Sequence, residues 1–210
     1  MTVATEFLSF NASGGLLADP SLAEPTYQYL KKADGCLSVR YGFQVEETRL
    51  LIIITWETYG HYQRITERED YAAFITALPT NLASSLQIEV VEFNGDTSEA
   101  LASPVTDTSI VTVKEGQTEQ DINTRFTLTN EMGVKLRVAE HPDSKYPTLM
   151  VWGVVKDMPG SYIFLCGWDS IETHREYLKR STEADLAPEL QAIFSGLIDL
   201  DVRHVSVKTA

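Results

Sequence analysis

The chain of 210 residues is long enough for one domain or a little more, because domains usually hold about 100–200 residues. Its composition, 43% hydrophobic and 22% charged, is typical of an ordinary globular protein. Seventeen Lys and Arg residues against 30 Asp and Glu residues give a net charge of −13, which argues against nucleic acid and anionic membrane surfaces as partners.

The sequence also indicates a compartment. Its longest apolar run, Leu50–Ile54, is far shorter than the roughly 18–20 residues of a membrane-spanning helix. The segment Met1–Glu6 has neither a basic region nor a long apolar region, so we expect no signal peptide. Cys36 and Cys166 are too few and too far apart for a disulfide framework or a zinc knuckle. We therefore expect a reduced, cytoplasmic protein.

The predicted elements of the first half follow the order βαββαβ, the ferredoxin-like arrangement. In chain order they are strand 5–10, helix 19–35, strands 36–45 and 49–56, a helical region over about 59–78, and strand 86–93. Asp19 and Pro20 suit the start of the helix and Gly35 its end. Pro79 is a stop signal for the second helical region.

The second half repeats this order. Its predicted elements are strand 109–113, helix 119–132, strands 148–157 and 161–168, helices over about 170–180 and 185–197, and strand 201–207. We expect Gly133 to end the first of these helices. The segment 134–142 has no counterpart in the first half, and its alternating pattern predicts an extra strand or β-arm.

Two similar segments identify the repeat. Leu50–Trp56 and Tyr162–Trp168 are apolar strands that end in Trp, and each precedes a helical segment with a His, at His61 and His174. The spacing from one Trp to the other differs by a single residue from the spacing between the two His residues. We therefore predict two ferredoxin-like units.

The domain boundaries follow from this repeat. We place the first unit at 1–95, a polar, turn-rich linker at 96–105 and the second unit at 106–210. Helices on one side of each sheet would leave its other face bare, although both Trp-ending strands are apolar on both faces. We therefore expect an α+β fold that forms a barrel-like pseudo-dimer within one chain, or else a homodimer with 134–139 as an arm.

Aromatic and imidazole side chains mark a candidate crevice between helix and sheet. His61 and His174 share a helix face with aliphatic residues, so we expect both rings to point towards the sheet. Four aromatic residues are expected to line the crevices: Trp56, Trp168, Tyr41 and Trp152. Such a crevice suits a planar small molecule and proton transfer.

A purely structural interpretation is open for the same residues. A repeated Trp and His can reflect a repeated core, and Thr58, Asp169 and Ser170 are N-cap candidates. Cys36 and Cys166 read as small buried hydrophobic residues. We expect the two remaining histidines, His141 and His204, to be solvated, because they lie in or near alternating segments.

Several chemistries lack a signature in the sequence. No Gly-rich phosphate loop follows a strand, and no Gly-x-Ser-x-Gly motif is present. The four histidines do not cluster with each other or with Cys or Asp at metal-ligand spacing. We therefore expect no metal and no cofactor.

The segment Gly167–Tyr177 and the βαββαβ repeat resemble the dimeric α+β barrel superfamily. They are most similar to its antibiotic-biosynthesis-monooxygenase-like group, particularly the tandem-domain members common in fungi. The resemblance implies a ligand crevice between each sheet and its helices, and a place in secondary metabolism. The stretch Ser170–Tyr177 is similar to a helix of plant polyketide cyclases whose matching Tyr is catalytic, which makes Tyr177 a candidate.

Two functions are consistent with these patterns. The first is a cofactor-independent tailoring enzyme, an oxygenase, cyclase or isomerase, that acts on an aromatic or polyketide-like molecule. In that case His174 or His61 would be the general acid or base, Tyr177 a hydrogen-bond donor, and Trp168 and Trp152 stacking walls. The alternative is a non-catalytic, small-molecule-binding or stress-type protein of the same fold. We expect the second half to be the active one.

Overall fold

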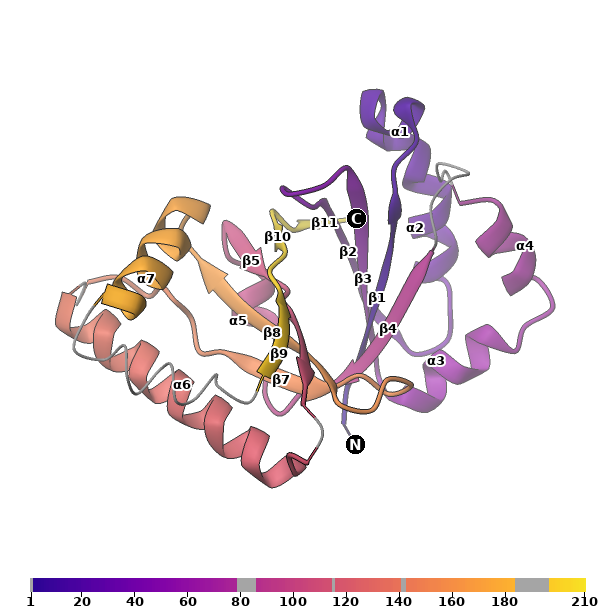
Figure 1. Ribbon diagram of the computed structural model, residues 1–210. Helices are drawn as coiled ribbons and strands as arrows, with labels where there is room; N and C mark the ends of the chain where they lie inside the picture. Colours follow the sequence, from indigo (N-terminus) through magenta and orange to yellow (C-terminus); the bar gives the residue numbers. More distant parts are fainter. Residues whose placement is uncertain (1, 79–85, 115, 141–142, 184–196) are drawn as a thin grey trace. The chain divides into compact units, whose positions relative to one another are not determined.

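The chain folds into two compact units in the computed structural model, which describes residues 2–78, 86–114, 116–140, 143–183 and 197–210 (Figure 1). The first unit comprises Met1–Phe93, Val155–Asp157 and Val205–Ala210, and the second comprises Asn94–Val154 and Met158–His204. Residues 96–105, the predicted linker, carry the short helix α5 (Ser98–Leu101) and lie within the second unit.

The first unit is a five-stranded sheet with the strand order β11-β2-β3-β1-β4. Its strands are β1 (Ala4–Asn11), β2 (Cys36–Phe43), β3 (Arg49–Trp56), β4 (Gln87–Glu92) and β11 (Lys208–Thr209). Its helical elements are α1 (Gly14–Ala18), the 3-10 helix η1 (Pro20–Ala23), α2 (Glu24–Lys31), α3 (Tyr59–Thr66) and α4 (Tyr71–Thr76). The predicted βαββαβ order is confirmed, with one added edge strand.

The helices of this unit are shorter than predicted. The helix expected over 19–35 is divided into η1 and α2, and the region expected over 59–78 is divided into α3 and α4. The second division falls at Glu67–Asp70, four consecutive charged and exposed residues. Arg68 and Asp70 form an ion pair there, with Nη2 and Oδ2 2.7 Å apart.

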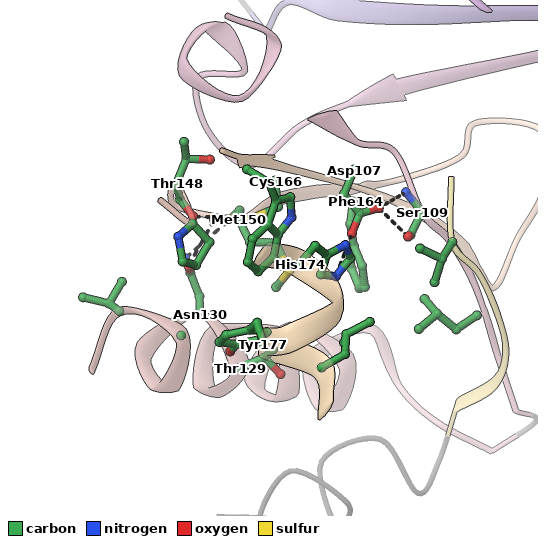
Figure 2. A pocket seen from close by; sticks show the side chains of 17 residues that line it. Asp107, Ser109, Thr129, Asn130, Thr148, Met150, Phe164, Cys166, His174 and Tyr177 are labelled. Atoms are coloured by element: carbon green, nitrogen blue, oxygen red, sulfur yellow. Dashed lines mark hydrogen bonds and ion pairs between the residues drawn. The ribbon is translucent and has the colours of Figure 1, made fainter. Parts of the chain in front are cut away.

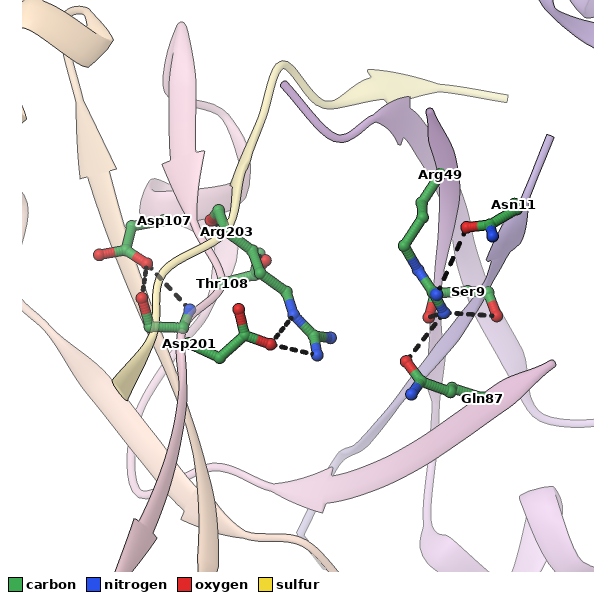
Figure 3. Close-up of polar contacts among 9 residues, drawn as sticks. Ser9, Asn11, Arg49, Gln87, Asp107, Thr108, Asp201 and Arg203 are labelled. Atoms are coloured by element: carbon green, nitrogen blue, oxygen red, sulfur yellow. Dashed lines mark hydrogen bonds and ion pairs between the residues drawn. The ribbon is translucent and has the colours of Figure 1, made fainter. Parts of the chain in front are cut away.

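The centre of the first sheet is buried as the sequence predicts. Leu50–Ile54 of β3 are all buried, although alternate side chains of a strand point to opposite faces. Arg49 at the start of β3 ties three strands together, because its Nη2 donates to Ser9 Oγ on β1 at 2.9 Å and to Gln87 Oε1 on β4 at 2.8 Å (Figure 3).

The second unit repeats the arrangement around β8 (Ser161–Trp168). The other strands are β5 (Val105–Asp107), β6 (Ile110–Val113), β7 (Val151–Val154), β9 (Leu197–Asp201) and β10 (His204–Val205), and the helices are α6 (Glu119–Glu140) and α7 (Ile171–Glu183). β5 and β6 pair with β8 in one continuous register, so together they correspond to β1. They are separate because the Ser109 N–H donates to the Asp107 carboxylate instead of to a neighbouring strand.

The extra strand predicted at 134–142 is wrong. The helix predicted to end at Gly133 continues as α6 to Glu140. Gly133 lacks the positive φ that would mark a helix end, and a short alternation of apolar and polar residues is also compatible with a helix. Within the described residues, no helix combines the length and apolar character that crossing a bilayer requires.

The C-terminal part differs from the predicted single strand 201–207. β9 ends at Asp201, and β10 and β11 follow as two short strands. Asp201 and Arg203 form an ion pair at the interruption, with 2.6 Å between Oδ2 and Nη2 (Figure 3). The helix predicted at 185–197 lies outside the described residues except for Leu197, which begins β9.

Close packing explains one glycine and provides a stability test. A Cβ atom on Gly42 would lie 2.4 Å from Val205 Cγ2 and 2.6 Å from the Ser206 carbonyl oxygen. We expect Gly42→Ala to lower the free energy of unfolding by about 1–3 kcal/mol, because a strand next to β2 must move. A Cβ atom on Gly60 in α3 would make only ordinary van der Waals contacts, so Gly60→Ala should raise the free energy of unfolding by up to about 1 kcal/mol. Denaturant unfolding measures the stability of both variants. Equal free energies of unfolding for Gly42→Ala and Gly60→Ala would contradict this packing.

Candidate functional site

The second unit contains a cavity of about 120 Å³ between its sheet and the helices α6 and α7 (Figure 2). On this measure one water molecule needs about 10–15 Å³, so the cavity has room for a small organic molecule. Most of its lining is apolar, including Met150, Phe164, Trp168 and Leu200. Asp107, Ser109, His174 and Tyr177 supply polar groups to the same lining.

His174 is the imidazole of this cavity. Its ring stacks on Trp168 with centroids 4.3 Å apart and planes inclined by 16°, and the residue is only 4% exposed. Its Nδ1 atom lies 2.6 Å from Nε2 of His204, which is equally buried. The two rings therefore share a hydrogen bond in the interior of the protein.

Asp107 faces the other nitrogen of His174. Its Oδ2 atom lies 3.7 Å from His174 Nε2, and both side chains are almost fully buried. Asp107 Oδ1 accepts hydrogen bonds from the Ser109 backbone N–H, at 2.9 Å, and from the Ser109 hydroxyl (Figure 2). Asp107, His174 and His204 thus form a row, and Ser109 holds the carboxylate end of this row in place.

Strand register and a helix cap position these groups. Val105 pairs with Trp168 and Asp107 with Cys166, so Asp107 lies on the same sheet face as the Trp168 ring. The Ser170 hydroxyl caps α7 by accepting from the Thr173 N–H at 3.1 Å, which confirms Ser170 as an N-cap.

The helix then presents the site residues on one face. His174, Tyr177 and Leu178 follow at helical spacing and all line the cavity. The predicted inward direction of His174 is therefore confirmed.

Tyr177 is held over Trp168, with ring centroids 5.3 Å apart. Burial, and to a smaller extent the neighbouring Cys166, raises the pKa of Tyr177 to about 12, so the phenol remains a hydrogen-bond donor near neutral pH. Gly133 of α6 makes room for this phenol, because a Cβ there would lie 3.2 Å from the Tyr177 oxygen.

Cys166 is a buried thiol in the same lining. Burial, and next the charge of Asp107, raises its pKa, and its thiol donates to the Thr148 carbonyl oxygen at 3.5 Å. A thiol in this state is a poor nucleophile. The prediction of a small buried residue is confirmed for Cys166, whereas Cys36 is only half-buried.

Trp152 does not belong to the residues that line this cavity. It is buried on β7, where its Nε1 donates to Asn123 Oδ1 at 2.8 Å and its ring meets Phe126 edge to face at 5.6 Å. Within the second unit, the structure therefore brings together His174, Tyr177 and Trp168 from the predicted set, but not Trp152.

The remaining predicted residues belong to the first unit. Trp56 is fully buried, and its Nε1 donates to Glu6 Oε2 at 2.9 Å. Tyr41 stacks on Tyr27 with centroids 4.6 Å apart. Their two rings and Trp56 belong to the continuous hydrophobic core of this unit.

The expectation that His61 points into a crevice is wrong. Its Nδ1 lies 2.9 Å from the hydroxyl of Thr58, and its Nε2 faces the exposed carboxylates of Glu57 at 3.5 Å and Asp34 at 3.8 Å. The ring packs over Gly35, where a Cβ would overlap it. The reason is the one-residue difference in spacing: Tyr62, not His61, lies six residues after Trp56, as His174 lies six after Trp168.

The sequence-based interpretation missed two residues of the row. Asp107 was not singled out, and the prediction that His204 is solvated is wrong, because it is 4% exposed. Thr108 N–H donates to Arg203 O, and this register places His204 opposite Asp107. A carboxylate within the strand-like start of both halves, Glu6 and Asp107, was the available signal. His141 lies outside the described residues.

The first unit shows the same positions with other side chains. Glu6 pairs with Ile54, two residues before Trp56, as Asp107 pairs with Cys166, two residues before Trp168. Across from Glu6 on the other neighbouring strand is Val90, where the second unit has His204. The carboxylate is thus common to both units, whereas the two imidazoles are present only in the second.

No group of three or more His, Cys, Asp or Glu side chains in the described parts of the chain is arranged to hold a metal ion. In the row of Asp107, His174 and His204, the two imidazoles share a hydrogen bond, and the carboxylate faces the second nitrogen of His174 at 3.7 Å. Such an array can accept, donate and relay a proton.

Comparison with solved structures identifies the fold. A predicted monooxygenase from Lactobacillus acidophilus aligns over 100% of this chain and 96% of its own, with a TM-score of 0.60 and 12% identity. An anthrone oxidase-like protein aligns over 100% and 93%, with a TM-score of 0.69 and 13% identity. A mutant chlorite dismutase from Candidatus Nitrospira defluvii aligns over 99% and 92%, with a TM-score of 0.60 and 11% identity.

No protein-family profile matches the sequence, and neither does any curated protein. The likeness to the solved structures is one of fold, and it extends over the whole chain. The chain therefore has the dimeric α+β barrel fold, built from two tandem ferredoxin-like units.

The buried carboxylate of the first unit gives a pH-dependent prediction. Burial raises the pKa of Glu6 from 4.5 to about 7, against the lowering effect of the Trp56 hydrogen bond. The unfolded chain releases this proton at lower pH than the folded one. The free energy of unfolding should therefore fall by up to about 3 kcal/mol as the pH rises from 4.5 to 7, and level off above.

Glu6→Gln keeps the acceptor for Trp56 and removes the titration, so its stability should not fall over this range. Exposed Glu67→Gln is the matched control and should follow the wild type. Urea unfolding at several pH values measures all three. A Glu6→Gln variant that loses as much stability as the wild type would contradict the raised pKa.

Proposed function

We propose that the chain is a cofactor-independent tailoring enzyme that acts on an aromatic or polyketide-like molecule in the cavity of the second unit. The observation that carries this proposal is the buried His174, stacked on Trp168 and placed between Asp107 and His204 in the wall of an apolar cavity. Oxygenation, cyclisation and isomerisation all begin with proton movement on such a substrate, which these side chains are equipped to perform.

Each side chain has a distinct part in this proposal. His174 and the Asp107 carboxylate beside it form the acid–base pair, and Tyr177 donates a hydrogen bond to a substrate oxygen because its phenol keeps its proton. Trp168 and Phe164 provide flat apolar walls. The first unit, whose corresponding positions belong to a hydrophobic core, acts as structural support.

The names of two structural neighbours support this choice of reaction. One is a predicted monooxygenase and the other an anthrone oxidase-like protein, and both align over the whole chain. Anthrone, a planar ketone in equilibrium with its enol, is therefore the first substrate to test. Three further points stay predictions. They are a cytoplasmic location, a role in secondary metabolism, and an oligomeric state that is either a monomer with an internal pseudo-dimer or a homodimer.

An activity assay tests the proposal through substitutions at the site. With anthrone and its hydroxylated derivatives under air, we expect His174→Ala to lower kcat/KM by about 100-fold or more and Tyr177→Phe by about tenfold. His61→Ala tests the alternative base that the sequence suggested. This variant and the exposed control Gln63→Ala should each change kcat/KM by less than about twofold. Absorbance and mass spectrometry follow substrate and product. Unchanged turnover in both His174→Ala and Tyr177→Phe would refute the assignment.

A non-catalytic small-molecule binder is the second candidate. It is favoured by the observation that both ring nitrogens of His174 already face side chains, His204 at 2.6 Å and Asp107 at 3.7 Å. This candidate predicts that aromatic compounds raise the melting temperature through the second unit while none is converted. Saturable binding without turnover across the substrate panel would favour it over the enzyme.

A further inference from the structure

The row Asp107–His174–His204 has a preferred arrangement of protons. A neutral imidazole carries one N–H, and the two rings meet through His174 Nδ1 and His204 Nε2, so one donates and the other accepts. The Asp107 carboxylate on the far side of His174 favours the N–H at Nε2. Nδ1 of His174 then accepts, and His204 is the donor.

This arrangement gives the cavity an acceptor next to a donor. Asp107 Oδ2 and His174 Nε2 are 3.7 Å apart, which is longer than a hydrogen bond, and both residues line the cavity. A single ligand hydroxyl can therefore donate a hydrogen bond to Asp107 and accept one from His174. His204 is not part of the lining and acts on the ligand only through His174.

The charge of the residues that line the cavity determines which kind of ligand oxygen can bind there. Among the described residues that line the cavity there is no Lys or Arg, and Asp107 brings a carboxylate. A ligand carboxylate or phosphate would meet this like charge inside an apolar wall, with no cation among these described residues to compensate it. A neutral, weakly acidic hydroxyl on a flat ring satisfies both groups.

We propose that the ligand is a phenol or an enol whose hydroxyl proton passes to Asp107, while His174, positioned by His204, donates to the resulting oxyanion. The O–H bond of the ligand breaks, a new O–H bond forms on Asp107, and the electron pair stays on the ligand oxygen. The step involves no oxidant. It rests on the proposed function, because it takes place in the same cavity. Asp107 is thus a catalytic residue and His204 a positioning residue.

Paired probes test the ligand class. 4-Nitrophenol carries the hydroxyl, and 4-nitroanisole is a similar ring without the proton. By calorimetric titration at a pH low enough to keep 4-nitrophenol un-ionised, the wild type should bind the phenol at least about tenfold more tightly than the ether. Asp107→Asn should reduce this preference to about two- or threefold, whereas Asp169→Asn, which neutralises an exposed carboxylate at the start of α7, should preserve it.

The outcomes separate this inference from the proposed function. Equal binding of both probes to the wild type would overturn the phenol assignment and leave the aromatic site intact. Binding of neither probe would overturn the site itself. Should Asp107→Asn not fold, Ser109→Ala removes one of the two hydrogen bonds that hold the carboxylate, and an unchanged preference there overturns the role of Asp107.

Nitrogen NMR of the histidine rings tests the role of His204. We expect the wild-type spectrum to show the His174 proton on Nε2, and His204→Leu to shift it towards Nδ1 and weaken the phenol preference. His204→Gln, whose amide N–H replaces the donor, should restore both. A wild-type His174 protonated at Nδ1, or a His204→Leu variant with the wild-type tautomer and preference, would overturn the positioning role.

Discussion

The pairing of the first strand of each unit with the strand that ends in Trp is the constraint on which the rest of the structure depends. It places a carboxylate two positions from the partner of that Trp, on the face covered by the helices. Glu6 and Asp107 occupy this position. The Glu6 side chain is longer than that of Asp107 by one methylene group, and the surroundings of the two carboxylates differ. Glu6 accepts a hydrogen bond from Trp56, whereas Asp107 is held by Ser109 and faces His174.

The same position has therefore become structural in one unit and open to chemistry in the other. In the first unit the carboxylate is enclosed in an aromatic core and keeps its proton to about pH 7. In the second, two imidazoles stand beside the carboxylate and a cavity adjoins them. Among the described residues the Trp168 Nε1 atom has no hydrogen-bond partner, whereas the Nε1 atom of Trp56 donates to Glu6. The Asp107 side chain is shorter than that of Glu6 and does not make the corresponding hydrogen bond to Trp168.

Much of the architecture could be predicted from the sequence because it depends on local patterns. The apolar strand β3, the cap at Ser170 and the inward face of α7 follow from periodicity and side-chain chemistry. Which residues face each other on neighbouring strands does not follow from such local patterns. His204 was misjudged because its burial depends on Asp107, nearly a hundred residues away, and His61 because a one-residue shift decides which side chain faces inward. Gly133 was misjudged because a glycine can also mark close packing within a helix.

An experimental structure of the wild-type chain with bound 4-nitrophenol tests the central claim most directly. The account predicts the ring beside Trp168 in the cavity of the second unit, with its oxygen within hydrogen-bond distance of both Asp107 Oδ2 and His174 Nε2. It also predicts that the bond between His174 and His204 is kept. A ligand bound elsewhere, or a direct Asp107–His174 hydrogen bond that excludes the ligand oxygen, would contradict the account.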